Sequence, residues 1–128
     1  MNGTARFFVV AGALALAAGV ALGAVSAHAA KSAPHPEAAR LLQTAVLYQL
    51  VHGLGLLAVG ILARGPAASR LLALSGALLL AGIAAFCGSL YTLAFTAVSL
   101  GVLAPVGGSA FMAGWVALAV WAIRHKPG

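Results

Sequence analysis

The chain has 128 residues, of which 63% are hydrophobic and only 6% are charged, and Glu37 is its one acidic residue. Soluble domains carry about 25% charged residues, so this composition excludes an ordinary soluble domain and indicates an integral membrane protein. The net charge of +6 does not indicate nucleic-acid binding, because the seven Lys and Arg residues are scattered singly and form no basic patch.

Four apolar segments follow one another along the chain, and each is close to the about 20 residues that an α-helix needs to cross a bilayer. They cover about residues 7–27, 41–63, 71–95 and 106–123. These lengths predict an all-α membrane protein, a four-transmembrane-helix bundle that occupies residues 1–128 as a single membrane domain. Few residues remain outside the segments, so any chemistry is expected within the bundle or at its rims.

The first apolar segment has an alternative interpretation as a secretory signal peptide. Ala27-His28-Ala29 before Ala30 is an acceptable small-residue cleavage site, and cleavage there would leave three helices. However, the apolar stretch is about 21 residues long, which exceeds the 7–15 typical of a signal peptide, and its only preceding charge is Arg6. We therefore expect the first helix to be retained.

The linkers predict the orientation of the helices and the breaks between them. The cationic residues are distributed unequally, with Arg6, Arg64, Arg70, Arg124 and Lys126 on one side and Lys31 and Arg40 on the other. By the positive-inside rule, both termini are expected to face the cytoplasm. In the polar outer linker, residues 28–40, Pro36 and Glu37 suit a helix start. Gly65-Pro66 and residues 104–108 predict the other two breaks.

Small residues recur at a spacing of four along the first and last segments, as in Gly19 and Gly23, Gly23 and Ala27, and Ala110 and Gly114. Such faces allow helix backbones to approach closely in a membrane. Alanine and glycine are so common in this chain that we expect packing within the bundle, with a seam between copies of a homo-oligomer as the alternative.

The second segment carries three polar side chains, Tyr48, Gln49 and His52, within an otherwise apolar helix. Tyr48 and His52 are four residues apart and share a helix face, with Gln49 on its flank. Counted from Leu41, His52 lies about 16 Å deep, close to the bilayer midplane, and Tyr48 lies about 6 Å nearer the outside. An ionisable side chain at this depth is costly and marks a candidate functional site.

Polar residues on two other segments are expected at a comparable outer depth. Ser89 and Tyr91 belong to the third segment, and His28 ends the first. The candidate ligand-binding set is therefore Tyr48, Gln49, His52, Ser89, Tyr91 and His28. In the alternative interpretation these side chains only form hydrogen bonds between helices, and Tyr91 is an interfacial belt residue.

The sequence indicates no metal, cofactor or catalytic residue. His28 and His52 differ in depth by about 15 Å and cannot share one ion. Zinc needs three or four ligands, and Cys87, the only cysteine, also excludes an intramolecular disulfide. Glu37 lies in the outer linker, where it is not expected to orient His52 for nucleophilic catalysis. No glycine-rich phosphate loop is followed by a lysine, and buried acids suited to ion pumping are absent from the sequence.

Four short motifs resemble those of a known family. Residues 23–28 (GAVSAH) resemble Gly-Ala-Phe-Gly-Ala-His, and Tyr48 to His52 resembles Tyr-x-x-x-His. Residues 86–91 (FCGSLY) resemble Phe-x-Gly-Ser-Leu-Tyr, and residues 104–115 are similar to Thr-Pro-x-Gly-Gly-x-x-Phe-x-x-Gly-Trp. In this order and spacing, nearly the whole chain resembles the DUF423 family, also called UPF0382, of small four-helix membrane proteins.

The resemblance implies a bacterial inner-membrane protein, with relatives in mitochondria-bearing organisms, four retained helices and no established biochemical activity. It implies the motif positions His28, Tyr48, His52, Ser89, Tyr91, Gly107, Gly108 and Trp115. The chain departs from the family motifs at Ser26, which replaces a glycine, and at Ala104, which replaces the threonine before the proline.

Three hypotheses for function follow. The first is a non-enzymatic module that packs with a larger membrane protein complex or with membrane lipid, its polar residues fixing the helix arrangement. The second is a binding site in the outer half of the bundle, where Tyr48 and His52 bond the head of a small amphipathic ligand such as a quinone or lipid. The third is an oligomeric channel or transporter.

Overall fold

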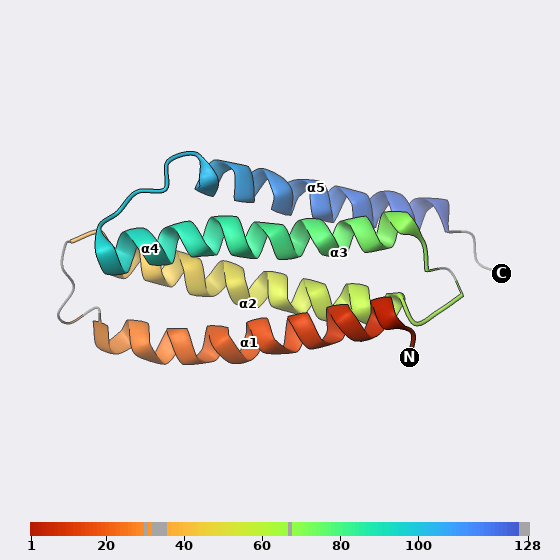
Figure 1. Cartoon of the computed structure of the whole chain (residues 1–128), viewed down its shortest axis with the longest axis horizontal. Coiled ribbons are helices and arrows are strands. Elements are labelled where there is room, and N and C mark those ends of the chain that lie inside the picture. The colour runs from red at the N-terminus through yellow and green to blue at the C-terminus, as the bar shows by residue number, and fades with distance from the viewer. Residues whose placement is uncertain (30, 32–35, 67, 126–128) are drawn as a thin grey trace.

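The computed structural model describes residues 1–29, 31, 36–66 and 68–125, and these residues form four long helical rods (Figure 1). The third rod is continuous over Arg70–Thr96 and contains three elements. The elements are α1 (Gly3–Ala29), α2 (Ala38–Leu62), α3 (Arg70–Gly82), the π-helix η2 (Ile83–Cys87), α4 (Gly88–Thr96) and α5 (Leu103–Arg124). Each rod is long and apolar enough to span a bilayer, which confirms the predicted four-helix membrane architecture.

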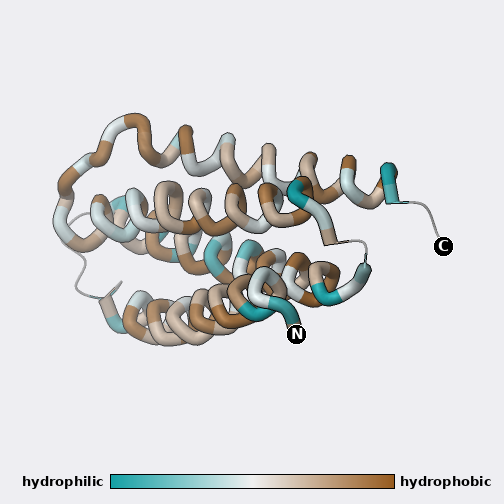
Figure 2. Tube along the Cα trace, turned by 45° about the vertical axis from the view of Figure 1, so that its right-hand side comes forward, coloured by the Kyte–Doolittle hydropathy of each residue, from teal (hydrophilic) through white to brown (hydrophobic). Residues whose placement is uncertain are grey.

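The rods are arranged with α1 and α5 at opposite edges and with α2 and the third rod between them (Figure 1). The best buried part of the core lies between α2 and α3, where Leu56, Val59, Leu72 and Leu79 are fully buried. Hydrophobic residues cover most of each rod, and hydrophilic residues gather mainly near the ends (Figure 2). This distribution is the one that a bilayer requires of lipid-facing helices.

The start of α1 and the end of α5 lie at the same end of the bundle, together with the end of α2 and the start of α3 (Figure 1). We call this the terminal end, and we call the opposite end, where α1 leads to α2 and α4 leads to α5, the loop end. The terminal end carries Arg6, Arg64, Arg70 and Arg124.

The last helix begins earlier than the sequence predicted. We expected a break over residues 104–108 and a helix from 106, but α5 begins at Leu103 and includes Pro105 in its first turn. Proline is tolerated there because the first N–H groups of a helix have no partner within the helix. The second helix begins slightly later than predicted. A start near Pro36 was expected, but α2 begins at Ala38, with Glu37 as its N-cap residue.

Close backbone contact holds α1 against α2 toward the terminal end. A Cβ atom added to Gly12 would lie 2.8 Å from the Gly53 carbonyl oxygen, and one added to Gly60 would lie 2.9 Å from the Val9 nitrogen. Close packing through small residues was predicted at other positions, and it is found at two of them, since an added Cβ would lie 2.8 Å from Leu50 Cδ2 at Gly19 and 2.9 Å from Leu79 Cδ2 at Gly114. At Gly23, which was predicted to contribute, the nearest atom is Val46 Cγ1 at an ordinary 3.5 Å.

The π-helix η2 in the middle of the third rod was not predicted. It lies against α5, where Gly107 brings the α5 backbone onto the backbone of Phe86 so closely that a Cβ atom would clash. Short π segments are frequently found at functional sites in helices. Tyr48 and His52 of α2 lie beside this contact.

Candidate ligand-binding site

The six residues predicted to form a site do not form one cluster. Tyr48 and His52 face aromatic residues of η2 and α5, whereas Gln49 faces α1 and α4. Ser89 and His28 make hydrogen bonds within their own rods. The polar residues of α2 therefore take part in two different arrangements, an aromatic group around Tyr48 and His52 and a hydrogen-bonded group around Gln49.

Gln49 connects three helices. Its Nε2 donates to the carbonyl oxygen of Ala15 at 2.9 Å, and its Oε1 accepts from the Tyr91 hydroxyl at 2.7 Å. The Gln49 side chain is only 5% exposed, so both hydrogen bonds lie in a water-poor environment. This arrangement matches the interhelical hydrogen bonding that was the alternative interpretation. The sequence could not indicate the acceptor on Ala15, because every residue carries a backbone carbonyl.

Ser89 and His28 have local partners. The Ser89 hydroxyl donates to the Ala85 carbonyl oxygen in η2, and His28 Nδ1 lies 3.2 Å from the Ala24 carbonyl oxygen at the exposed end of α1. Both hydrogen bonds return to the rod that carries the residue. Ser89 and His28 therefore do not belong to the group around His52.

Tyr48 and His52 form an aromatic group with three residues that sequence reasoning did not connect to them. The His52 ring stacks on Phe111 with centroids 3.5 Å apart, and its centroid lies 5.7 Å from that of Trp115. The Tyr48 ring lies 4.8 Å from Phe86. The family motifs contain all of these residues, but only the fold shows that α5 and η2 bring them to one face of α2.

The hydrogen bond of His52 fixes which ring nitrogen can meet a ligand. His52 Nδ1 lies 2.7 Å from the Tyr48 carbonyl oxygen, and because a carbonyl only accepts, Nδ1 carries the proton. In the neutral ring Nε2 is then an acceptor. Within the part of the chain that the structure describes, neither Nε2 nor the Tyr48 hydroxyl has a hydrogen-bond partner. His52 is 5% exposed, so Nε2 is an available acceptor on a buried side chain.

A cavity of about 610 Å³ lies beside this aromatic group, between α2, η2 and α5. We call it the lateral pocket. Its volume is within the roughly 300–1,000 Å³ usual for small-molecule sites. Its lining combines three polar side chains, those of Tyr48, His52 and Ser109, with apolar residues, and the Ser109 hydroxyl already donates to the Pro105 carbonyl oxygen. The apolar lining includes Phe86, Pro105, Gly108, Phe111, Met112 and Trp115.

Glycines shape the lateral pocket in two ways. A Cβ atom on Gly55 would lie 2.8 Å from Cη2 of Trp115, so this glycine makes room for the indole. Gly82 similarly makes room for the ring of Phe111. At Gly108, by contrast, the nearest atom to an added Cβ is Phe86 Cδ2 at 3.9 Å. Gly107 is needed for helix packing because a Cβ atom there would clash with the backbone of Phe86, whereas Gly108 leaves space that belongs to the pocket.

The groups needed for metal binding or acid-base chemistry do not gather at the lateral pocket. Among the described residues, no three side chains of the His, Cys, Asp and Glu types lie together. Glu37 forms an exposed ion pair with Arg40 at 3.2 Å. It precedes His52 on α2 by about four helical turns, so this carboxylate does not reach the imidazole.

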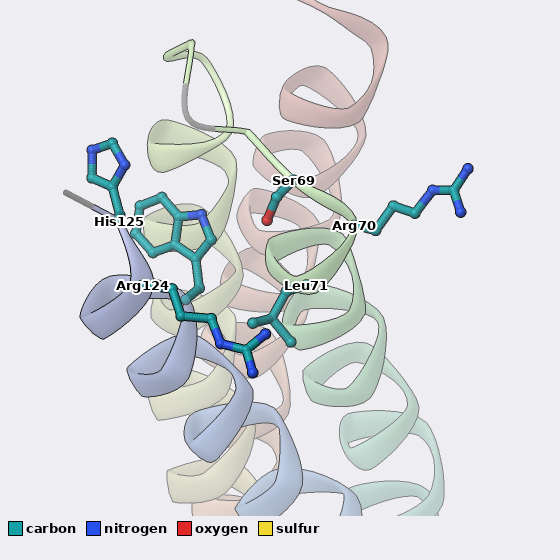
Figure 3. A pocket seen from close by; sticks show the side chains of 6 residues that line it. Ser69, Arg70, Leu71, Arg124 and His125 are labelled. Carbon is teal, nitrogen blue, oxygen red and sulfur yellow. The ribbon is translucent and has the colours of Figure 1, made fainter. Parts of the chain in front are cut away.

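A second cavity, of about 400 Å³, lies at the terminal end between the start of α3 and the end of α5. Figure 3 shows that the side chains of Arg70 and Arg124 extend in different directions, so their charges do not converge on one point. The rings of Trp121 and His125 stack with centroids 5.4 Å apart. This cavity is a basic rim of the bundle and lacks the converging donors of an anion site.

Comparison with known proteins identifies relatives that share almost the whole chain. Residues 22–108 match the family model described as "Protein of unknown function (DUF423)". The UPF0382 membrane protein YwdK of Bacillus subtilis (strain 168) is 35% identical over 121 residues, covering 94% of this chain and 98% of the relative. A UPF0382 membrane protein of Haemophilus influenzae is 37% identical over 108 residues, covering 84% and 86%. The UPF0382 inner membrane protein YgdD of Escherichia coli (strain K12) is 34% identical over 128 residues, covering 96% and 94%. No solved structure matches the chain.

Proposed function

Because the chain belongs to the DUF423 family of membrane proteins, whose description assigns no function, we propose a function from the geometry of the lateral pocket. The protein is a non-enzymatic accessory protein that binds one amphipathic molecule with a planar ring head of the quinol type, whose hydroxyl groups can donate hydrogen bonds. The ring lies between the aromatic side chains, and its apolar tail extends into the surrounding lipid.

The observation that carries this proposal is the Nε2 atom of His52. It is an acceptor without a partner among the described residues, on a buried side chain that lines a cavity of about 610 Å³. Nε2 belongs to a membrane-spanning helix, where no water is present to bond it, and a polar atom without a hydrogen bond costs free energy there; a ligand hydroxyl that donates to Nε2 would remove that cost. The Tyr48 hydroxyl can donate to a second oxygen on the ligand.

The walls of the lateral pocket favour a flat ring over a flexible chain. Phe86, Phe111 and Trp115 line it together with Tyr48 and His52. Aromatic pairs in offset or edge-to-face contact contribute about 0.5–1.5 kcal/mol beyond the burial of their area. A ring with two oxygen substituents can use both the stacking surfaces and the two hydrogen-bonding side chains, which an acyl chain cannot.

The environment of this function is the bacterial inner membrane, with both termini in the cytoplasm. The Escherichia coli relative carries the words inner membrane in its name. The four arginines of the terminal end support a cytoplasmic position for this end by the positive-inside rule. In this membrane the protein, with its ligand bound, packs with surrounding lipid and with a larger membrane protein complex.

Binding can be measured through Trp115, which lines the lateral pocket. We would titrate the full chain in detergent, under reducing conditions, with a benzoquinol that carries a decyl tail and follow quenching of fluorescence, in a Trp121→Phe background so that Trp115 is the reporter. We expect saturable quenching. Loss of the histidine in His52→Phe should weaken binding about five- to tenfold, the range expected for one hydrogen bond of about 1–1.4 kcal/mol.

Two variants provide controls for the titration. His28→Phe is the same substitution at an exposed histidine outside the pocket and should leave binding unchanged. Gly108→Leu fills the open space beside Phe86 and should abolish saturable quenching while the helices remain folded. Quenching that rises linearly without saturation would rule out the proposed site. So would saturable quenching that is as strong in the His52→Phe and Gly108→Leu variants as in the protein without these substitutions.

A further inference from the structure

A third cavity lies on the other side of α2, between α1 and α2 toward the loop end, and has a volume of about 360 Å³. Figure 1 shows that α1 and α2 lie close together near the terminal end and separate toward the loop end. The glycine contacts agree, because Gly12 and Gly60 leave no room for a Cβ atom, whereas Gly23 meets only Val46 at 3.5 Å. We call this opening the α1–α2 groove. Its lining includes Gly23, Ser26, Gln43, Val46, Leu47 and Leu50.

Ser26 gives the α1–α2 groove an unusual polar group. Its side chain is 7% exposed, and its hydroxyl is the one buried side-chain oxygen or nitrogen in the described part of the chain that has no hydrogen-bond partner. Buried polar groups in proteins almost always have a partner, because leaving them unpaired costs free energy. Ser26 also stands where the family motif has glycine, so the hydroxyl is a feature of this chain beyond the shared motif.

We propose that the α1–α2 groove binds an ester-linked bilayer phospholipid. The Ser26 oxygen is covered in this structure, so its side chain turns about the Cα–Cβ bond to donate to an ester carbonyl oxygen of the lipid in the groove. This site is separate from the lateral pocket and does not depend on its function. An ester carbonyl matches the hydroxyl because it accepts and cannot donate. Beyond Gln43, the groove side chains Val46, Leu47 and Leu50 are apolar and continue deeper along α2, as an acyl chain requires.

The position of Ser26 along the bundle fits the depth of a lipid ester. With 27 residues, α1 is about 40 Å long, which exceeds the about 30 Å hydrocarbon core, so its last turn reaches the interfacial region. Ser26 lies three residues before the end of α1 at Ala29, at the boundary between headgroups and acyl chains. From Ala39 to Leu50 the groove follows α2 for about 16 Å toward the middle of the bilayer.

The test compares two lipids that differ only in the acceptor. Native mass spectrometry of the full chain in detergent would measure retention of dioleoyl phosphatidylglycerol and of the analogue whose chains are joined by ether bonds. We expect about fivefold greater retention of the ester lipid, the ratio expected for one hydrogen bond. Ser26→Ala should retain both lipids equally, at the level of the ether lipid.

Two further variants locate the effect. Gly23→Leu places a side chain into the α1–α2 groove, where only Val46 lies near, and should reduce retention of both lipids with little change in melting temperature. Gly108→Leu alters the lateral pocket and should leave the preference for the ester lipid unchanged. Equal retention of the two lipids by the unaltered protein, or an ester preference that persists in Ser26→Ala, would overturn the proposal.

Discussion

Tyr48, Gln49 and His52 are close neighbours in the sequence, but their side chains leave α2 in two directions. Gln49 bonds to Ala15 of α1 and to Tyr91 of α4, whereas the rings of Tyr48 and His52 pack with those of η2 and α5. The first arrangement joins helices, and the second borders the lateral pocket. A substitution at Gln49 is therefore expected to lower the stability of the folded protein, whereas one at His52 is expected to weaken ligand binding.

Gln49→Leu should destabilise the folded protein by about 1–2 kcal/mol. It removes two interhelical hydrogen bonds and leaves the Tyr91 hydroxyl unpaired, while the Ala15 carbonyl keeps its bond within α1; each interhelical bond in a membrane is worth about 0.6–1 kcal/mol. His52→Phe keeps a ring stacked on Phe111 and should change stability by less than about 0.5 kcal/mol. Unfolding by a denaturing detergent would measure both. A loss in His52→Phe as large as that in Gln49→Leu would show that His52 holds the helices together.

The candidate residues could be predicted from the sequence, but their grouping could not. Polarity within an apolar segment singles out His52 and Gln49, because such residues are costly in a membrane. Whether they meet depends on which neighbouring helix each side chain faces. For Gln49 the partner includes the backbone of Ala15, and for His52 it is the ring of Phe111, which reads in the sequence as an ordinary apolar residue.

At the scale of elements, helix number and approximate length follow from apolar runs, while the irregular features do not. The π-helix Ile83–Cys87 has the same apolar composition as its neighbours and lacks a proline that would mark a break. Pro105 suggested a break and instead lies in the first turn of α5. Both features lie beside the close contact between η2 and α5 at Gly107, which only the packed structure shows.

The adjacent glycines Gly107 and Gly108 provide a matched pair that tests this contact. Gly107→Ala should lower stability by about 1–3 kcal/mol, because the new Cβ meets the backbone of Phe86, which cannot move as a flexible side chain could. Gly108→Ala meets nothing closer than 3.9 Å and should be neutral or slightly stabilising, since alanine also favours a helix over glycine. Melting temperatures in detergent would compare the two. Equal effects would contradict the assigned packing of α5 on η2.

At the scale of the whole molecule, the row of helices explains why one small chain has two membrane-facing cavities. With α1 and α5 at opposite edges, α2 has a neighbour on each side, and the lateral pocket and the α1–α2 groove open beside it. The apolar segments predict four spans but not their lateral order. That order depends on glycines and aromatic rings that meet only between helices, such as Gly55 with Trp115 and Gly12 with Gly53.

The orientation of this row in the membrane decides from which leaflet the two cavities are reached, and cysteine labelling can measure it. Cys87 is 1% exposed, so the unaltered protein should react little with a membrane-impermeant thiol reagent on intact cells. Ser99→Cys adds an exposed thiol at the loop end, and Ala68→Cys adds one at the terminal end. Because the arginines of the terminal end favour the cytoplasm, Ser99→Cys should be labelled on intact cells, and Ala68→Cys only after the membrane is opened. The reverse pattern would place both cavities toward the cytoplasmic leaflet, and their ligands would then have to enter from that side.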